Sequence, residues 1–151
     1  MKRWGRMALL VCLVAPMWFG ATGAAAQGAG ERILDYEVSI EIEPQGSLLV
    51  VEEIAYDFGG DQRHGIIREV PVRFRYDDRY DRVYPLDVLS VVGSEGTPDQ
   101  YEVNKSGNLL QIKIGDPDRT ITGPHTYTIT YRVQGALNGF ADHDELYWNA
   151  I

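Results

Sequence analysis

The sequence contains almost no cysteine. Its one cysteine, Cys12, lies in an apolar stretch near the N-terminus, so residues 27–151 have none. This part of the chain can form no disulfide, and it offers neither a thiol nucleophile nor a thiolate ligand for a metal ion. About 125 residues suffice to bury a core without such cross-links. The domain must therefore be held together by packing.

Positive charge is also scarce. Three of the 14 basic residues and none of the 22 acidic residues lie in positions 1–26, so the remainder carries 11 basic and 22 acidic residues, a net charge of −11. Binding to nucleic acid needs a concentrated positive field, and docking on anionic lipid needs a basic patch. The composition excludes nucleic acid as a partner and indicates that the charge serves mainly solubility.

No apolar run is long enough to span a bilayer, but a shorter one opens the chain. Residues 1–6 are basic, residues 7–19 are almost wholly apolar, and Ala24 to Ala26 form an Ala-x-Ala cleavage site. The apolar run of 13 residues is shorter than the ~20 that a membrane span requires. The pattern predicts a secretory signal peptide over residues 1–26, with an uncleaved anchor as the alternative. Residues 31–151 are then an exported domain.

Helical periodicity is missing after the signal segment, and apolar residues alternate with polar ones instead. Residues 34–42 and 47–58 alternate in this way, with a Pro-Gln-Gly turn at 44–46 between them, which predicts a β-hairpin. Further strands are expected over 66–76, 88–92, 101–105, 109–114 and 125–133, with Ser106-Gly107 as a second hairpin turn and a charged loop over 77–82. Pro71 lacks an amide donor, so its strand should lie at an edge or carry a bulge.

Seven to eight strands at this spacing predict an all-β fold, an antiparallel β-sandwich of the immunoglobulin or fibronectin kind. Spacing alone leaves a barrel open. Residues 146–148 are expected to begin one more strand. The apolar final residue, Ile151, follows this segment without a turn or polar tail, and we interpret it as a cut in a longer protein.

No catalytic signature is present. The sequence has no Gly-x-Ser-x-Gly elbow, no His-Glu-x-x-His and no phosphate-binding loop, so no catalytic residue, cofactor or metal site is predicted. By composition, residues 142–145 and the pair Asp116 and Asp118 are candidate calcium ligands. A solvated acidic loop and a turn held by aspartate side chains explain these two segments better.

The candidates for interaction are weak, and they are His64, Arg68, Asp144, Glu145 and Trp148. Arg68 shares a strand face with apolar residues, so it is expected to point inward and pair with Glu52, in which case its loss should cost more than ~2 kcal/mol. Trp148 could lie on an exposed binding platform. Tyr127 and Tyr131 are expected in the core, one of them as a corner tyrosine bonded to backbone.

Four arginines lie close together in one segment, at positions 73, 75, 79 and 82, mixed with aspartates. A self-compensating solvated loop is the simplest interpretation, and a surface that docks a partner is the alternative.

The order of several short segments resembles a known family. Val51-Glu52-Glu53-Ile54, His64-Gly65-Ile66-Ile67-Arg68, Ile112 to Asp116, the Tyr-x-Ile-x-Tyr strand within 123–131 and Asp144 to Asn149 are similar to the N-terminal domain of the domain-of-unknown-function 2207 family of predicted bacterial membrane proteins. The resemblance implies a signal peptide, an exported β domain and transmembrane helices that this chain lacks. It implies no known activity.

The sequence therefore predicts a non-enzymatic sensor, interaction or structural module on the extracytoplasmic face of a bacterial plasma membrane, in the periplasm or at the cell surface. Its partners would be the membrane, through a segment absent from this chain, and an unidentified protein or glycan. The alternative is a cell-envelope hydrolase or carbohydrate-binding domain with an acidic site, which would need carboxylates gathered in one cleft.

Overall fold

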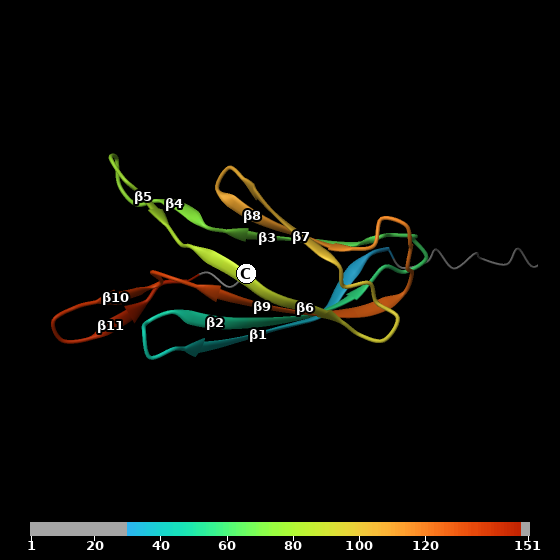
Figure 1. Cartoon of the computed structure of the whole chain (residues 1–151), viewed down its shortest axis with the longest axis horizontal. Coiled ribbons are helices and arrows are strands. Elements are labelled where there is room, and N and C mark those ends of the chain that lie inside the picture. The colour runs from blue at the N-terminus through green and yellow to red at the C-terminus, as the bar shows by residue number, and fades with distance from the viewer. Residues whose placement is uncertain (1–29, 149–151) are drawn as a thin grey trace, which may run out of the picture.

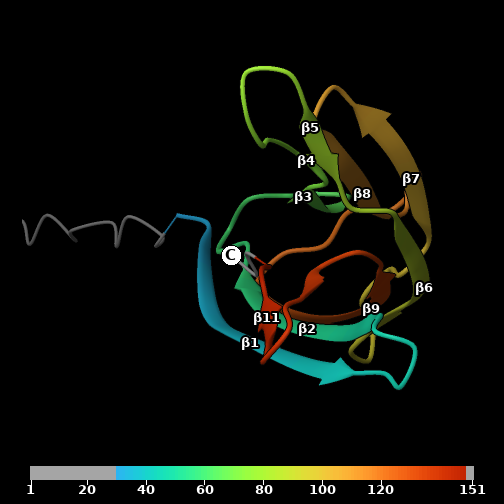
Figure 2. The same cartoon turned by 90° about the vertical axis from the view of Figure 1, so that its left-hand side faces the viewer.

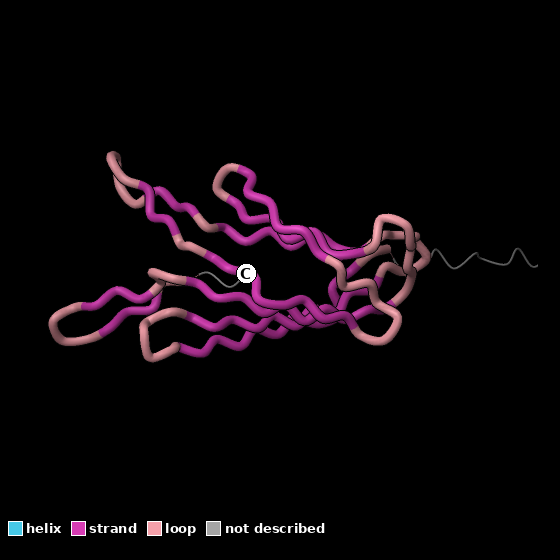
Figure 3. The backbone as a smooth tube through the Cα atoms, in the orientation of Figure 1, coloured by secondary structure: helices cyan, strands magenta, loops and turns pink. Residues whose placement is uncertain are grey.

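The structure is a computed structural model that describes residues 30–148 (Figure 1). All regular elements in this range are β-strands, and every pairing is antiparallel, which confirms the all-β prediction (Figure 3). No helix among these residues could cross a membrane. The predicted signal peptide over residues 1–26 and the predicted cut at Ile151 lie outside the described residues.

Seven strands of six or more residues build two sheets. The first sheet has the order β1-β2-β9-β6 and the second has the order β3-β8-β7. Their bounds are Arg32–Ile42 (β1), Leu48–Asp57 (β2), Gly65–Pro71 (β3), Leu86–Gly93 (β6), Tyr101–Ser106 (β7), Leu109–Gly115 (β8) and Pro124–Val133 (β9). As predicted from Pro71, β3 lies at a sheet edge.

Four strands of three residues each form two short hairpins that the sequence pattern did not predict. They are Arg73–Arg75 (β4) with Asp81–Val83 (β5), and Leu137–Gly139 (β10) with Asp144–Leu146 (β11). Part of the segment expected to be a charged loop is thus strand β5. The strand expected to begin at residue 146 instead ends there, as β11.

The two sheets face each other as a sandwich, with the core between them (Figure 2). Alternate residues of β2, β8 and β9 point inward because successive strand side chains project to opposite faces. The buried apolar set from these strands is Leu48, Val50, Ile54, Leu110, Ile112, Ile114, Tyr127, Ile129, Tyr131 and Val133. Burial of each large side chain contributes about 1.5–3 kcal/mol relative to exposure.

The strand order differs from that of an immunoglobulin domain. Lettered in chain order, an immunoglobulin sandwich has sheets ABED and CFG. Here the fifth and seventh long strands, β7 and β9, have exchanged sheets. The cause is the two-residue turn at Gly107 and Asn108, which pairs β7 directly with β8. The antiparallel sandwich prediction holds, and the immunoglobulin-like order is not found.

Strand β1 is less buried than its alternation suggests. Tyr36 and Val38 are half-buried against the core, while Leu34 and Ile42 are 49% and 53% exposed. The reason is its position, because β1 is an edge strand of the four-stranded sheet and has a neighbour on one side only.

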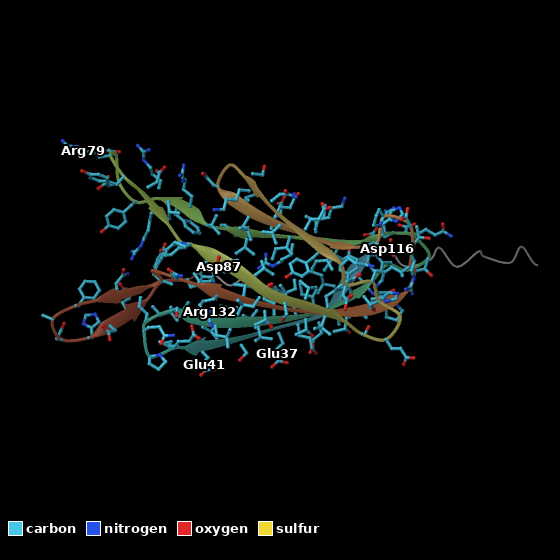
Figure 4. All side chains as sticks on the ribbon, viewed as in Figure 1. Glu37, Glu41, Arg79, Asp87, Asp116 and Arg132 are labelled. Carbon is cyan, nitrogen blue, oxygen red and sulfur yellow. The ribbon has the colours of Figure 1, made fainter. Side chains whose placement is uncertain are left out.

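The sandwich has two distinct ends. Figure 1 shows both short hairpins at one end and the loops that precede β3 and follow β8 at the other. Arg79 marks the hairpin end and Asp116 the loop end in Figure 4.

Candidate functional site

Two hairpins, β4–β5 and β10–β11, enclose a cleft of about 710 Å³ at one end of the sandwich. It is lined by Phe74, Arg75, Tyr76, Arg82, Tyr84, Leu137, Asn138, Gly139, Phe140, Glu145 and Tyr147. A neighbouring hollow of about 320 Å³ shares Phe74, Tyr84 and Tyr147 with this cleft and adds Leu146 and Trp148. We call the two together the hairpin cleft.

Local hydrogen bonds explain why the first hairpin forms. Asp77 Oδ1 accepts from the backbone amides of Arg79 at 2.7 Å and Tyr80 at 2.8 Å, and the amide of Tyr76 donates to the carbonyl of Tyr80. An aspartate that bonds to the backbone two and three residues ahead is a frequent turn former. The charged segment therefore closes a hairpin rather than remaining an open loop.

The second hairpin is closed in a similar way. The amide of Phe140 donates to the carbonyl of His143 at 2.8 Å, and the two rings stack with centroids 4.8 Å apart. Tyr147 then donates its amide to the carbonyl of Ala136, which fixes the segment that carries Trp148.

Aromatic rings form the floor and rim of the hairpin cleft. Tyr84 is only 1% exposed and packs edge-on against Phe74 and Trp148, with centroid separations of 5.6 and 5.7 Å. Tyr76, Phe140 and Tyr147 are more than half exposed at the rim. The floor is thus closely packed, and the rim offers accessible ring surface.

Arg82 is a cation in the hairpin cleft with no carboxylate partner among residues 30–148. Its Cζ lies 6.0 Å from the ring centre of Tyr76 and 5.5 Å from that of Tyr84. Its Nη2 donates to Asn138 Oδ1 and to the carbonyl of Gly135. These contacts hold the guanidinium in place without neutralising its charge.

Two polar atoms in the hairpin cleft are buried without a hydrogen-bond partner in the described residues. They are the hydroxyl of Tyr84 and Nε1 of Trp148. A buried polar group without a partner costs about 1–3 kcal/mol, and such groups are rare in native proteins. Burial raises the pKa of Tyr84 above its usual value, so its hydroxyl stays protonated and can donate.

The structure brings some of the predicted interaction residues together and separates others. Glu145 and Trp148 line the hairpin cleft, and Asp144 lies beside them on β11. His64 is at the opposite end, and Arg68 is in the interior. Sequence reasoning missed Phe74, Tyr76, Tyr84 and Phe140, although the density of aromatics over residues 74–84 was a usable signal.

Arg68 forms the ion pair with Glu52 that its position predicted. Its Nε donates to Oε2 at 2.7 Å and its Nη2 donates to Oε1 at 2.8 Å, so the pair is bidentate. Glu52 is fully buried, while the Arg68 side chain is 17% exposed. The pair joins β2 of one sheet to β3 of the other. Its role is therefore structural.

Two tyrosines complete this cluster. The Tyr131 hydroxyl donates to Glu52 Oε1 at 2.5 Å, and the Arg68 guanidinium lies 5.8 Å from the ring centre of Tyr36. Burial and the Glu52 charge raise the pKa of Tyr131. Burial alone would lower the pKa of Arg68, but its hydrogen bond to Glu52 and the Glu52 charge raise it overall.

The prediction of a backbone-bonded corner tyrosine is wrong for both core tyrosines. Tyr131 bonds to a carboxylate, and the Tyr127 hydroxyl has no partner among the described residues. Burial raises the pKa of Tyr127 to about 12. The Tyr131 hydroxyl bonds to the buried carboxylate of Glu52 on the neighbouring strand β2, a contact that sequence spacing could not show.

His64 holds the opposite end of the sandwich together. Its Nδ1 donates to the carbonyls of Asp116 and Arg119, both at 3.0 Å. Asp116 Oδ1 accepts from the Asp118 amide at 2.9 Å, the turn expected for this pair. Among residues 30–148, no three His, Cys, Asp or Glu side chains are grouped to hold a metal ion.

Residues 32–151 match the family model of the predicted membrane protein (DUF2207) N-terminal domain. No curated protein and no solved structure matches the chain.

Proposed function

The chain belongs to the DUF2207 family of predicted membrane proteins, and from this premise we propose that residues 31–151 are a non-enzymatic binding module displayed outside the cytoplasm. The N-terminal signal pattern supports export. The membrane character of the family supports a tether in the full-length protein.

The observation that carries the proposal is the hairpin cleft. A concave site with aromatic walls and a few convergent polar groups is the usual form of a ligand site. Here the Tyr84 hydroxyl and Trp148 Nε1 are buried donors without a hydrogen-bond partner among residues 30–148, and a ligand that reached these two atoms would supply the missing partner.

Binding without catalysis fits the distribution of carboxylates. Glu52 is the only buried carboxylate among the described residues, and it is occupied by Arg68 and Tyr131. Glu145 is the only carboxylate that lines the hairpin cleft within the same range. Glycoside hydrolysis ordinarily requires two carboxyl groups across one scissile bond.

Export can be tested by cysteine labelling, because the chain has no cysteine after Cys12. In a Cys12→Ser background, Ser106→Cys places a thiol at an exposed hairpin end. A membrane-impermeant maleimide should label it in intact cells as fast as in permeabilised cells. Labelling only after permeabilisation contradicts the extracytoplasmic placement.

Ligand occupancy of the hairpin cleft can be tested with Gly139→Cys. This glycine lines the hairpin cleft, and an added Cβ would meet only the Asp144 carboxylate, at 3.5 Å. The labelling rate of Gly139→Cys is divided by that of Ser106→Cys, once in cells and once with the purified protein. This ratio should be several-fold lower in cells than in the purified protein. Equal relative rates in cells and in the purified protein contradict a bound ligand.

A further inference from the structure

We propose that the hairpin cleft binds a saccharide that carries a carboxylate group, with the carboxylate on Arg82 and a sugar ring against the aromatic rim. This inference rests on the proposed function and specifies its ligand class.

The charge of Arg82 points to an anionic group. Its Nη2 is used by Asn138 and Gly135, whereas no bond from its Nε or Nη1 is seen within residues 30–148. A guanidinium presents its donors as a planar fork that matches a carboxylate. The two tyrosine rings beside it keep this fork in a fixed orientation.

The aromatic and polar groups point to a sugar. A pyranose ring has an apolar C–H face that can pack on exposed rings such as Phe140 and Tyr147, which are 55% and 58% exposed. Its hydroxyls can both donate and accept. They match the Tyr84 hydroxyl, which does both, and Trp148 Nε1, which only donates.

A peptide fits the hairpin cleft less well. A peptide that adds to a sheet edge needs a strand long enough to pair with, and β4, β5, β10 and β11 have three residues each. A peptide with several acidic side chains would also meet a domain of net charge −11. A saccharide with few carboxylates avoids both difficulties.

Trp148 is a built-in probe for this test. The other two tryptophans, Trp4 and Trp18, lie in the predicted signal segment, so Trp148 is the single tryptophan of residues 27–151, the segment used in the titration. Its fluorescence is titrated with saccharides containing glucuronate, sialate or muramate, with their neutral counterparts, and with tetraglutamate. At least one carboxylated saccharide should bind about tenfold or more tightly than its neutral counterpart.

Three variants connect binding to the hairpin cleft. Arg82→Gln should weaken binding about tenfold or more, whereas Arg79→Gln, at the exposed tip of the same hairpin, should leave it unchanged (Figure 4). Tyr84→Phe should weaken binding about two- to tenfold without lowering the melting temperature, because the hydroxyl has no partner in the described structure. A purely structural role for this hydroxyl would lower the melting temperature instead.

The outcomes separate this inference from the proposed function. Equal affinity for charged and neutral saccharides, binding of tetraglutamate alone, or equal losses in Arg79→Gln and Arg82→Gln would overturn the inference. If no saccharide binds while Gly139→Cys is protected in cells, the inference fails and the proposed function stands. If Gly139→Cys is also unprotected, the proposed function fails too.

Discussion

Replacing Arg68 with alanine is expected to lower the free energy of unfolding by about 3 kcal/mol. The change leaves Glu52 as a buried carboxylate without its cation. Removing one partner of a buried ion pair typically costs about 3–5 kcal/mol, because the remaining charge is neither solvated nor paired.

The geometry sets where in this range the cost falls. Glu52 accepts two hydrogen bonds from Arg68 and one from the Tyr131 hydroxyl, and the substitution removes the two from Arg68. The Arg68 side chain is 17% exposed, so water can enter the space that it vacates and partly solvate the carboxylate. The expected loss of stability therefore lies at the lower end of the range, at about 3 kcal/mol.

The assay is equilibrium unfolding in urea, followed by Trp148 fluorescence and by circular dichroism. Arg75→Ala is the matched control, since Arg75 is 67% exposed and pairs with Asp81 at 3.7 Å. A pair of this kind contributes about 0–1 kcal/mol, so the control should change stability little. A cost below about 1 kcal/mol for Arg68→Ala would refute the reasoning.

A second variant keeps the test decisive if Arg68→Ala does not fold. Glu52→Leu, Arg68→Met and Tyr131→Phe together remove both charges of the ion pair and the Tyr131 hydroxyl that donates to Glu52. Replacing a buried ion pair by packed apolar residues is often neutral or stabilising. The triple variant should fold and be more stable than Arg68→Ala, and a triple variant as unstable as the single one would show that charge is not the cause.

Three further predictions use melting temperatures. Hydrogen bonds from Arg132 and then from Ser47 lower the pKa of Glu43, so Glu43→Gln should melt below the wild type at neutral pH. The difference in melting temperature between the wild type and Glu43→Gln should be largest above pH 4.5 and should disappear as the pH falls below 4.5. A difference that does not change with pH would contradict this expectation. Gly65→Ala should lower the free energy of unfolding by about 2 kcal/mol or more, because φ is +152° and the new Cβ would lie 2.8 Å from the Cα of Gly115. An unchanged melting temperature would show that β3 and β8 can move apart at this position. Tyr127→Phe should be neutral or stabilising by up to about 1 kcal/mol, since it removes a buried hydroxyl that lacks a partner in the described structure, and a clear loss would reveal an unseen partner.

Much of the fold could be predicted from local pattern. Alternation located the long strands, and Pro71 placed β3 at an edge. The Glu52–Arg68 pair could also be predicted, because each residue is a charge on an apolar strand face and needs a partner of opposite sign.

The strand order and the hairpin cleft could not be predicted in the same way. The tight turn at Gly107 and Asn108 already favoured pairing of β7 with β8, but the partners of β9 depend on long-range contacts. In the hairpin cleft, Arg82 bonds to Asn138, which lies 56 positions later in the sequence. A local sequence pattern does not show that two residues so far apart in the chain are neighbours in space.

Side-chain alternation determined which residues face inward, because strand geometry is local and repeats every two residues. Only the tertiary structure decided that Trp148 and Glu145 lie in one cleft with the buried Tyr84 hydroxyl and with Arg82, which has no carboxylate partner among the described residues. These side chains come close together because the two short hairpins project from the same end of the sandwich. The position of the hairpins follows from how the sheets pack, rather than from either hairpin's own residues.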